Sequence, residues 1–400
     1  MRVIHVITRL VVGGAQENTI ATVLGLREKS GVNVSLISGP TAGAEGSLES
    51  VFINLPELFT VLPELVRPVH PLKDLLTLKK LEQIFRGQKP DIVHTHSGKA
   101  GILGRLAAGR AGVPVVIHTI HGPSFGNFQD AGSNFIFRAA EKKAARATTH
   151  FIVVADAMKA QYLAAGIGRP EQYTKIFSGF PLEPFLTAKN DPELRKKLGL
   201  APDDFVVGKI ARLFKLKGHD DLFAVAPELV RRNPKIKFLL VGDGEWRARF
   251  EQLAKSSRLE KHFTFTRLVP PSEVPKYVGI MDVLVHLSLR EGLPRALPQA
   301  LAAGKPVVAY DCDGAREICF DGRTGFLIPP GDLKNLAEKI IQLASDSTLQ
   351  KKMGRCGAQF VRENFAVKKM VEDIYDLYQK LTAESGLSFP SPRQTGRGPG

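Results

Sequence analysis

The chain has 400 residues, of which 44% are hydrophobic, and a formal net charge of +15 at pH 7. This length exceeds one ordinary hydrophobic core, so two domains are expected, and no apolar run reaches the roughly 18 residues of a membrane-spanning helix. No homeodomain, zinc-finger or RNP-type motif accompanies the basic charge, so nucleic acid is not an expected partner. Diphosphate substrates, an anionic membrane surface or a need for solubility alone would each favour such a charge.

The first half of the chain alternates strand-like and helical segments. Its opening, MRVIHVIT, alternates like the first strand of a domain and lacks the apolar core of a signal peptide. Strands are expected at residues 3–7, 32–37, 92–95, 115–119 and 151–154, and helices at 16–27, 72–86, 100–111 and 135–147. This alternation predicts a parallel sheet with right-handed crossovers.

The second half repeats the pattern after a proline-rich linker, residues 178–193. Further strands are expected at 206–210, 238–241, 263–265, 283–287, 307–309 and 325–328. We predict domains over 1–180 and 181–365, a helix over 366–384 that packs on the first domain, and a disordered tail over 385–400. The three cysteines have no metal-like spacing, and their odd, sparse count suits reduced thiols in a cytoplasm.

Residues 282–311 carry the most informative pattern. A buried strand at 283–287 leads into a polar loop with Glu291, and then into a helix that begins at Pro294 and ends at Gly304. Open α/β sheets bind ligands at the carboxyl ends of their strands. A carboxylate there accepts hydrogen bonds from hydroxyl groups, and the amides of a new helix can hold phosphate. The pattern therefore predicts a site for a nucleotide-sugar, which carries both groups.

Two upstream loops offer further contacts with phosphate. Arg212 and Lys217 follow the strand at 206–210 and can reach phosphate oxygens, Arg with a planar fork and Lys as a point charge. Gly13 and Gly14 follow the first strand, where backbone amides can approach a ligand without interference from a Cβ atom. A solvated basic loop and a structural turn are the simpler alternatives. The position of the basic loop ahead of the acidic one favours binding.

Two histidine motifs end neighbouring strands: VHTHSGKAG at 93–101 and HTIHGPSF at 118–125. His94 and His96 would share one face of their strand. Such spacing also occurs in zinc sites, but no cysteine or carboxylate nearby completes a ligand set, so a metal is not expected. The Asp-x-Asp at residues 311–313 is expected to form a plain turn rather than a metal site.

These motifs, in this order from Met1 to about Leu381, resemble retaining glycosyltransferases of the GT-B fold, in particular glycosyltransferase family 4. The likeness is greatest to bacterial members that build capsule, exopolysaccharide or lipid-linked oligosaccharides. It implies an α/β fold of two doubly wound, Rossmann-like domains facing a central cleft, with the acceptor on the first and the nucleotide-sugar on the second. It implies transfer of a hexosyl or N-acetylhexosaminyl group from a UDP-linked donor to a glycan or polyprenol-linked acceptor, in the cytoplasm or peripherally on the inner face of the plasma membrane.

The resemblance also implies roles for individual residues. The catalytic residues would be His121, Glu291, Arg212 and Lys217. The donor would contact Gly14, Arg212, Lys217, Gly242, Leu268, Glu291, Gly292, Leu293 and Gln299. The acceptor side would include Gly13, His96, Ser97 and Lys99. No cofactor and no metal are expected, because the two basic residues and helix amides would take over the role of a cation.

The chain departs from the family pattern at three positions. Gln299 stands where the family has a second glutamate that contacts the ribose, Ser178 where it has asparagine, and His286 where it has proline. A neutral acceptor binds a hydroxyl group more weakly than a carboxylate does, which would weaken nucleotide binding on the order of tenfold. A non-catalytic nucleotide-sugar-binding module is therefore one alternative. A nucleotide-sugar 2-epimerase, which uses a similar two-domain fold, is the other.

Residues 51–73 combine an apolar stretch with Arg67, His70 and Lys73. One interpretation is a core segment followed by a loop. The other is a surface patch that rests on an anionic bilayer while the protein receives a polyprenol-linked acceptor.

Overall fold

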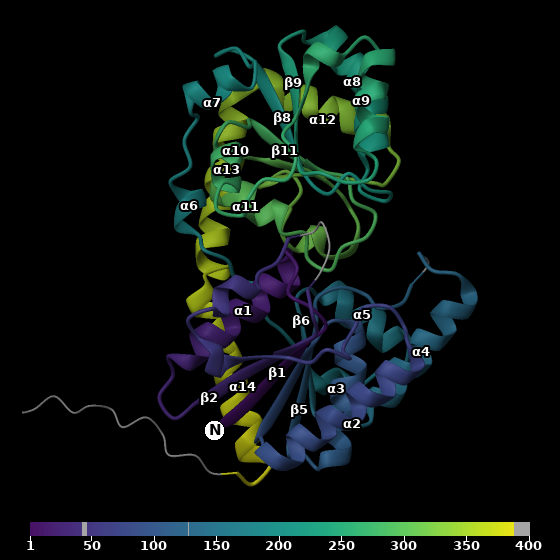
Figure 1. Ribbon diagram of the computed structural model, residues 1–400. Coiled ribbons are helices and arrows are strands. Elements are labelled where there is room, and N and C mark those ends of the chain that lie inside the picture. The colour runs from purple at the N-terminus through teal and green to yellow at the C-terminus, as the bar shows by residue number, and fades with distance from the viewer. Residues whose placement is uncertain (42–45, 127, 388–400) are drawn as a thin grey trace, which may run out of the picture. The chain divides into compact units, whose positions relative to one another are not determined.

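The computed structural model describes residues 1–41, 46–126 and 128–387 (Figure 1). The chain forms two compact units. Among the described residues, the first comprises those within 1–154, 158–180 and 367–387, and the second comprises 155–157 and 181–366. Most of the tail predicted over 385–400 lies outside the described residues. Each unit is built on its own parallel sheet, which confirms the predicted fold class.

The first unit contains a seven-stranded parallel sheet with the strand order β3-β2-β1-β4-β5-β6-β7. Its strands are β1 (Arg2–Ile7), β2 (Asn33–Ser38), β3 (Phe59–Val61), β4 (Ile92–His96), β5 (Val115–Ile120), β6 (His150–Val153) and β7 (Tyr173–Lys175). The five predicted strands are all present. The two strands that sequence reasoning missed, β3 and β7, are three residues long and lie at the two edges of the sheet.

Helices cover this sheet (Figure 1). They are α1 (Gly14–Arg27), α2 (Pro71–Gln88), α3 (Gly98–Ala111), α4 (Ala131–Ala145), α5 (Asp156–Ala164) and α14 (Val367–Glu384), with 3-10 turns at Glu49–Phe52, Pro56–Leu58 and Pro170–Gln172. The last helix returns to the unit in which the chain began. Ile374, Leu377 and Tyr378 of α14 share a core with Val3 and Val23 of β1 and α1.

The second unit contains a six-stranded parallel sheet with the order β10-β9-β8-β11-β12-β13. Its strands are β8 (Phe205–Ile210), β9 (Ile236–Val241), β10 (Phe263–Phe265), β11 (Val283–His286), β12 (Val307–Tyr310) and β13 (Gly325–Ile328). Its helices are α6 (Glu183–Leu186), α7 (Pro192–Lys197), α8 (His219–Arg232), α9 (Arg247–Ser256), α10 (Val274–Gly279), α11 (Ala296–Ala302), α12 (Leu333–Ser345) and α13 (Ser347–Asn364), with 3-10 turns at Glu260–His262 and Asp313–Glu317.

The helix predicted to begin at Pro294 begins two residues later, at Ala296. Pro294 and Arg295 form a turn instead, in which the amide of Leu297 donates to the carbonyl of Pro294 at 3.2 Å. The helix ends as predicted, because Gly304 just beyond it has a φ of 69°, which glycine adopts at no steric cost.

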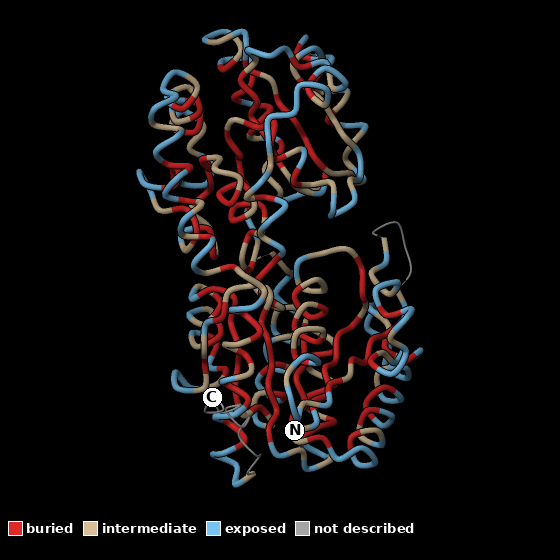
Figure 2. Tube along the Cα trace, turned by 90° about the vertical axis from the view of Figure 1, so that its left-hand side faces the viewer, coloured by how far each residue is buried: buried red, intermediate tan, exposed pale blue. Residues whose placement is uncertain are grey.

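The central strands of both sheets are buried along almost their whole length (Figure 2). Helices cover both faces of a parallel sheet, so its strands are near-continuous apolar runs rather than alternating ones. Among the described helices, none combines the length and the low charge that crossing a bilayer requires.

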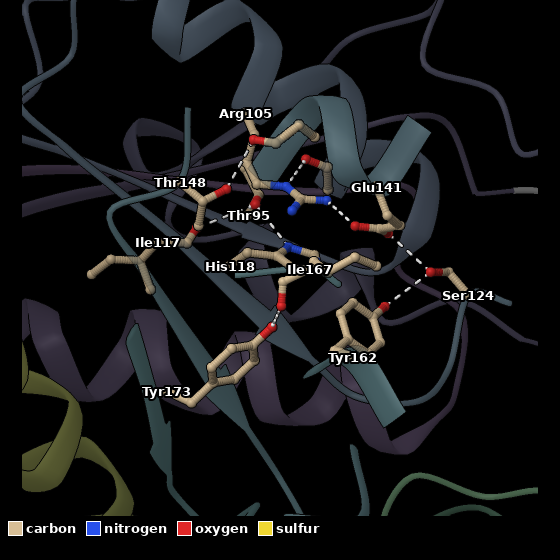
Figure 3. A network of polar contacts seen from close by, with 12 residues as sticks. Thr95, Arg105, Ile117, His118, Ser124, Glu141, Thr148, Tyr162, Ile167 and Tyr173 are labelled. Atoms are coloured by element: carbon tan, nitrogen blue, oxygen red, sulfur yellow. Dashed lines mark hydrogen bonds and ion pairs between the residues drawn. The ribbon is translucent and has the colours of Figure 1, made fainter. Parts of the chain in front are cut away.

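An ion pair is fully buried in the first unit (Figure 3). Arg105 of α3 donates to the carboxylate of Glu141 of α4 at 2.6 Å, and both side chains have 0% exposure. Arg105 Nε also donates to the carbonyl of Gly101. The second carboxylate oxygen accepts from the hydroxyl of Ser124, which in turn contacts Tyr162 of α5. The ion pair therefore connects two helices to the loop after β5.

Replacing Glu141 with glutamine should leave the Arg105 charge buried without a counter-ion. Breaking a buried pair costs about 3–5 kcal/mol, so the free energy of unfolding from urea titration should fall by that order. The matched control is Glu171→Gln, which removes an ion pair with Arg169 whose side chains are 66% and 71% exposed. The control should leave stability essentially unchanged, and equal stability of both variants would contradict the importance of the buried pair.

Candidate functional site

The glycine loop of the first unit lies between β1 and α1. Gly13 precedes the first helical residue, Gly14, and its carbonyl accepts from the amide of Glu17 at 3.0 Å. Gly13 is partly exposed and Gly14 is exposed. The residues at the start of this 14-residue helix are therefore at least partly exposed, as a role in binding phosphate would require.

Ser97 and Lys99 lie at the junction of β4 and α3. Ser97 has a φ of 66°, an unusual positive value for a residue with a side chain, and it precedes the first helical residue. The ammonium group of Lys99 pairs with Asp74 of α2 and donates to the carbonyl of Pro68. Two of the three N–H donors of Lys99 are thus engaged within the unit.

His121 directly follows β5 and is half-buried. Its Nε2 lies 3.1 Å from Nδ1 of His96, and Nε2 of His96 lies 2.9 Å from Nδ1 of His5. Burial lowers the pKa of His121 to about 4 and that of His5 to about 3, so both rings are neutral near pH 7. His96, which was predicted on the acceptor side, is only 1% exposed and contacts His121 through Nδ1.

The two faces of β4 differ as expected. The rings of His94 and His96 lie side by side with centroids 4.3 Å apart, whereas Thr95 on the opposite face contacts Nδ1 of His118 at 2.9 Å (Figure 3). Potential ligand atoms of His5, His94 and His96 lie within 4.8 Å of one another. Sequence reasoning missed His5, because the register that places it beside His94 joins residues far apart in the chain.

In the second unit, Lys217 and Glu291 form an ion pair at the carboxyl ends of β8 and β11. Ser288 donates to the same carboxylate oxygen at 3.1 Å. The amide of Glu291 donates to Asp313 at 2.7 Å, which anchors the backbone of the acidic loop. Two predicted site residues, 74 positions apart, are thus in direct contact.

Backbone constraints hold the basic loop, residues 211–218 between β8 and α8, against the end of β11. Leu216 and Gly218 both have positive φ values, 66° and 64°. A Cβ atom at Gly218 would lie 2.0 Å from the carbonyl oxygen of Leu287, so only glycine allows this approach. The carbonyl of Leu216 accepts from the amide of Leu289 at 2.9 Å. The loop that carries Lys217 is therefore fastened next to the loop that carries the acidic residue.

The carboxyl group of Glu291 is held ionised. Its burial opposes ionisation, but the charge of Lys217, the proximity of His286 and the hydrogen bond from Ser288 outweigh this and lower its pKa. Nearby, burial and the charge of Lys217 lower the pKa of Lys209 to about 7. Lys209 is 1% exposed on β8. Its position inside the apolar run FVVGKI was the available signal, and sequence reasoning did not use it.

The other predicted donor residues surround this pair to different extents. Arg212 is exposed, with its guanidinium 5.1 Å from the ring centre of Phe214, and Leu268 is 56% exposed. Gly242 approaches the basic loop so closely that a Cβ atom would lie 2.3 Å from the carbonyl oxygen of Ala211. Gln299 is half-buried on α11.

Gly292 and Leu293 link the acidic loop to the turn that follows β12. Gly292 is buried, its carbonyl accepts from the amide of Gly314 at 3.2 Å, and Leu293 is partly buried. In the Asp-x-Asp segment, Asp311 pairs with Arg316, and Asp313 accepts from the acidic loop as described above. Both carboxylates thus have roles in the turn itself.

Two family models match the chain. The model for glycosyl transferases group 1 matches residues 190–360, and the model for Glycosyltransferase Family 4 matches residues 12–182. Each match falls mainly within one of the two units, and together the two contain the predicted site residues.

Several relatives match most of the chain, including two bacterial glycosyltransferases. A UDP-Gal:alpha-D-GlcNAc-diphosphoundecaprenol alpha-1,3-galactosyltransferase from Escherichia coli is 31% identical over 321 residues, which cover 79% of this chain and 82% of that protein. The capsular polysaccharide biosynthesis glycosyltransferase CapM from Staphylococcus aureus is 27% identical, with 82% and 87% covered.

Solved structures show the same fold. Crystal structures of HepE from Anabaena in complex with UDP and with UDP-glucose each have a TM-score of 0.79, at 23% and 24% identity, and cover 95% of this chain and 100% of HepE. One conclusion follows from the two sheets, the matched motifs and the sequence identity to a relative over about four-fifths of the chain. The chain belongs to glycosyltransferase family 4, whose members have the GT-B fold.

Proposed function

We propose that the chain transfers a sugar, with retention of configuration, from a UDP-linked donor to a glycan or polyprenol-linked acceptor in the synthesis of a cell-surface polysaccharide. Family membership makes it a glycosyltransferase that uses a nucleotide-sugar. The printed name of the E. coli relative specifies UDP-Gal as donor and a diphosphoundecaprenol-linked GlcNAc as acceptor. The HepE structures contain UDP and UDP-glucose. These relatives support the finer assignment of donor and acceptor.

The contact between Lys217 and Glu291 is the observation that carries this proposal. A donor diphosphate would attract Lys217 away from the carboxylate, so that the carboxylate could accept hydrogen bonds from hydroxyl groups of the sugar. One ion pair would thus be exchanged for two contacts with the donor. The exchange is feasible because the two side chains are 19% and 29% exposed rather than fully buried.

The proposed chemistry breaks the bond between the anomeric carbon and the diphosphate oxygen and forms a bond to the acceptor hydroxyl oxygen. The proton of that hydroxyl passes to the departing diphosphate. Lys217 and Arg212 would stabilise the negative charge that develops on the leaving group, in place of a metal ion. The ring of His121, in the first unit, would contact the reacting sugar. Because the ring is neutral, it would add no positive charge beside that sugar.

Glu291→Gln should reduce the rate of transfer by at least about two orders of magnitude. The reason is that a neutral amide cannot replace a carboxylate that both pairs with Lys217 and accepts hydrogen bonds from hydroxyl groups.

Lys217→Met should lower kcat and raise KM for the donor, since both the bound donor and the leaving group are charged. Steady-state kinetics with a panel of UDP-sugars and a lipid-diphosphate acceptor would measure both effects.

Lys215→Met is the matched control, since Lys215 is an exposed lysine two residues away in the same loop. It should retain the activity of the unaltered protein. A Glu291→Gln variant with normal turnover and a normal circular dichroism spectrum would refute the assignment of the acidic loop as the donor site.

Gln299→Glu should strengthen UDP binding by up to about tenfold if residue 299 contacts the ribose, because a charged acceptor forms the stronger hydrogen bond. Isothermal titration calorimetry with UDP measures the change. Gln342→Glu on α12, an exposed position, makes the same change of charge and should leave the affinity unaltered. No gain in the Gln299→Glu variant would mean that other residues bind the ribose.

We also propose that the start of α2 contacts an anionic membrane surface that holds the acceptor lipid. Leu72, Leu75 and Leu76 are 70%, 49% and 47% exposed, and the preceding Val69 is 73% exposed. The three leucines recur at helical spacing, so they share one face, and Lys79 continues that face one turn later. Exposed apolar side chains next to basic ones are typical of helices that bind at a bilayer surface.

Leu72→Gln combined with Leu75→Gln should reduce sedimentation with phosphatidylglycerol-containing vesicles, because these side chains supply the apolar contact. Binding of the unaltered protein should also weaken as salt is raised, since the electrostatic part is screened. Leu289→Gln, at a leucine of the second unit that is 42% exposed, is the control and should bind normally. If the unaltered protein ignores these vesicles at low salt, a soluble acceptor becomes the better proposal.

A further inference from the structure

A continuous chain of polar contacts runs from His121 into the core of the first unit. It passes from one histidine to the next and then through the hydroxyl of Tyr378 on the C-terminal helix. Its links are His121 Nε2 to His96 Nδ1 at 3.1 Å, His96 Nε2 to His5 Nδ1 at 2.9 Å, His5 Nε2 to Tyr378 at 3.3 Å, Tyr378 to His94 Nδ1, and His94 Nε2 to Thr119 Oγ1 at 2.7 Å.

Every group that follows His121 in this series of polar contacts is buried. His5, His94 and Tyr378 have 0% exposure, and His96 has 1%. Burial lowers the pKa of His94 and His96 well below the usual value for histidine and raises that of Tyr378. Each imidazole is therefore neutral near pH 7, with one nitrogen that donates a hydrogen bond and one that accepts.

The order of the contacts couples the tautomers of the four histidines. Each link between rings joins Nε2 of one histidine to Nδ1 of the next, and Tyr378 joins His5 Nε2 to His94 Nδ1 in the same sense. At a link between two rings, a ring that donates from Nδ1 requires the next to do the same, because otherwise two donors or two lone pairs would meet. Tyr378 has one O–H and two lone pairs, so it keeps the direction by accepting from one ring and donating to the other. Donation to Tyr378 from both rings would leave its buried O–H without an acceptor among these groups. A neutral chain can thus point only one way or the other. All four histidines must then carry their hydrogen on the same nitrogen, either Nδ1 or Nε2.

We propose that this chain sets the tautomer and the orientation of His121, and that Tyr378 is a positioning residue for sugar transfer. Nδ1 of His121 takes no part in this series of contacts. It then presents either an N–H donor or a lone pair to the substrate, but not a mixture of the two. Groups in the core decide which of the two it presents. The consequence for transfer rests on the proposed function, whereas the coupling of the tautomers does not.

A metal ion is the alternative use of these side chains, since His5, His94 and His96 offer ligand atoms close together. Binding an ion would require a ring nitrogen to give up its hydrogen bond, because a lone pair that coordinates a metal cannot also accept a proton donor. In the structure, both nitrogens of each of the three rings lie within 3.3 Å of a partner in the chain.

Long-range ¹H–¹⁵N correlation spectra of protein labelled with ¹⁵N-histidine distinguish the two tautomers of each ring. In the unaltered protein near pH 7, His5, His94, His96 and His121 should share one tautomer. Tyr378→Phe removes the hydroxyl group at the centre of the chain, so His94 should become independent of the other three and His121 should populate both forms. Mixed tautomers in the unaltered protein, or an unchanged His121 signal in the variant, would overturn the proposal.

Tyr375→Phe is the matched control, because Tyr375 lies on the same helix, is partly buried and bonds with Gln379 instead. Its spectrum should equal that of the unaltered protein. If Tyr378→Phe folds poorly, Thr119→Val removes the group at the far end of the chain. This change leaves the links among the four histidines intact. All four rings should therefore still share one tautomer population, and rings that differ from one another in Thr119→Val would overturn the coupling.

Transfer kinetics test the second part of the proposal. Tyr378→Phe should lower kcat about tenfold or more while KM for the donor changes little, because a misplaced group acts mainly in the transition state. Normal kcat despite mixed tautomers would overturn the positioning role. If His121→Ala also transfers normally, the proposed contact of His121 with the sugar is wrong, whereas the spectra still decide the coupling.

Calorimetric titration with ZnCl₂ decides the metal alternative. Weak or absent binding by the unaltered protein is expected. Tight binding of one equivalent, lost in His5→Gln, would overturn the hydrogen-bonded chain and assign the cluster to a metal.

Discussion

In the first unit, the ion pair between Arg105 and Glu141 joins α3 and α4 to the loop that follows β5. Because both charges are fully buried, neither can be removed without leaving the other unpaired, so the two helices are held in one arrangement. The same carboxylate accepts from Ser124, three residues after His121. The loop that carries His121 is thereby attached to α4, and the histidine chain contacts the ring through Nε2.

The acidic and basic loops of the second unit depend on a different kind of ion pair. Lys217 and Glu291 are partly exposed. The surrounding contacts fix the backbone of the two loops rather than the charged groups. Gly218 packs against the end of β11, and the amide of Glu291 donates to Asp313. A ligand can compete for the two side chains without disturbing the loops. The permanent pair thus stabilises the fold, and the exchangeable pair fits the proposed binding of a diphosphate.

Sequence reasoning succeeded where the signal was local. The apolar runs of the central strands, and the glycine after α11, have direct physical causes in burial and in backbone conformation. The family motifs placed Lys217 and Glu291 at the ends of their strands, and the structure brings the two into contact. Reasoning failed for β3 and β7, because three residues at the edge of a sheet carry too little periodicity. It also started α11 too early, because a proline fits a turn as well as a first helical turn.

The sequence by itself determined the alternation of strands and helices, the two-domain organisation and the membership of a glycosyltransferase family. These depend on hydrophobic periodicity and on short motifs, which act over a few residues. Only the tertiary structure revealed that His5, His96 and Tyr378 form one hydrogen-bonded chain, because His5 and Tyr378 are 373 positions apart. The register of parallel strands and the packing of the last helix bring them together, and neither leaves a local pattern in the sequence.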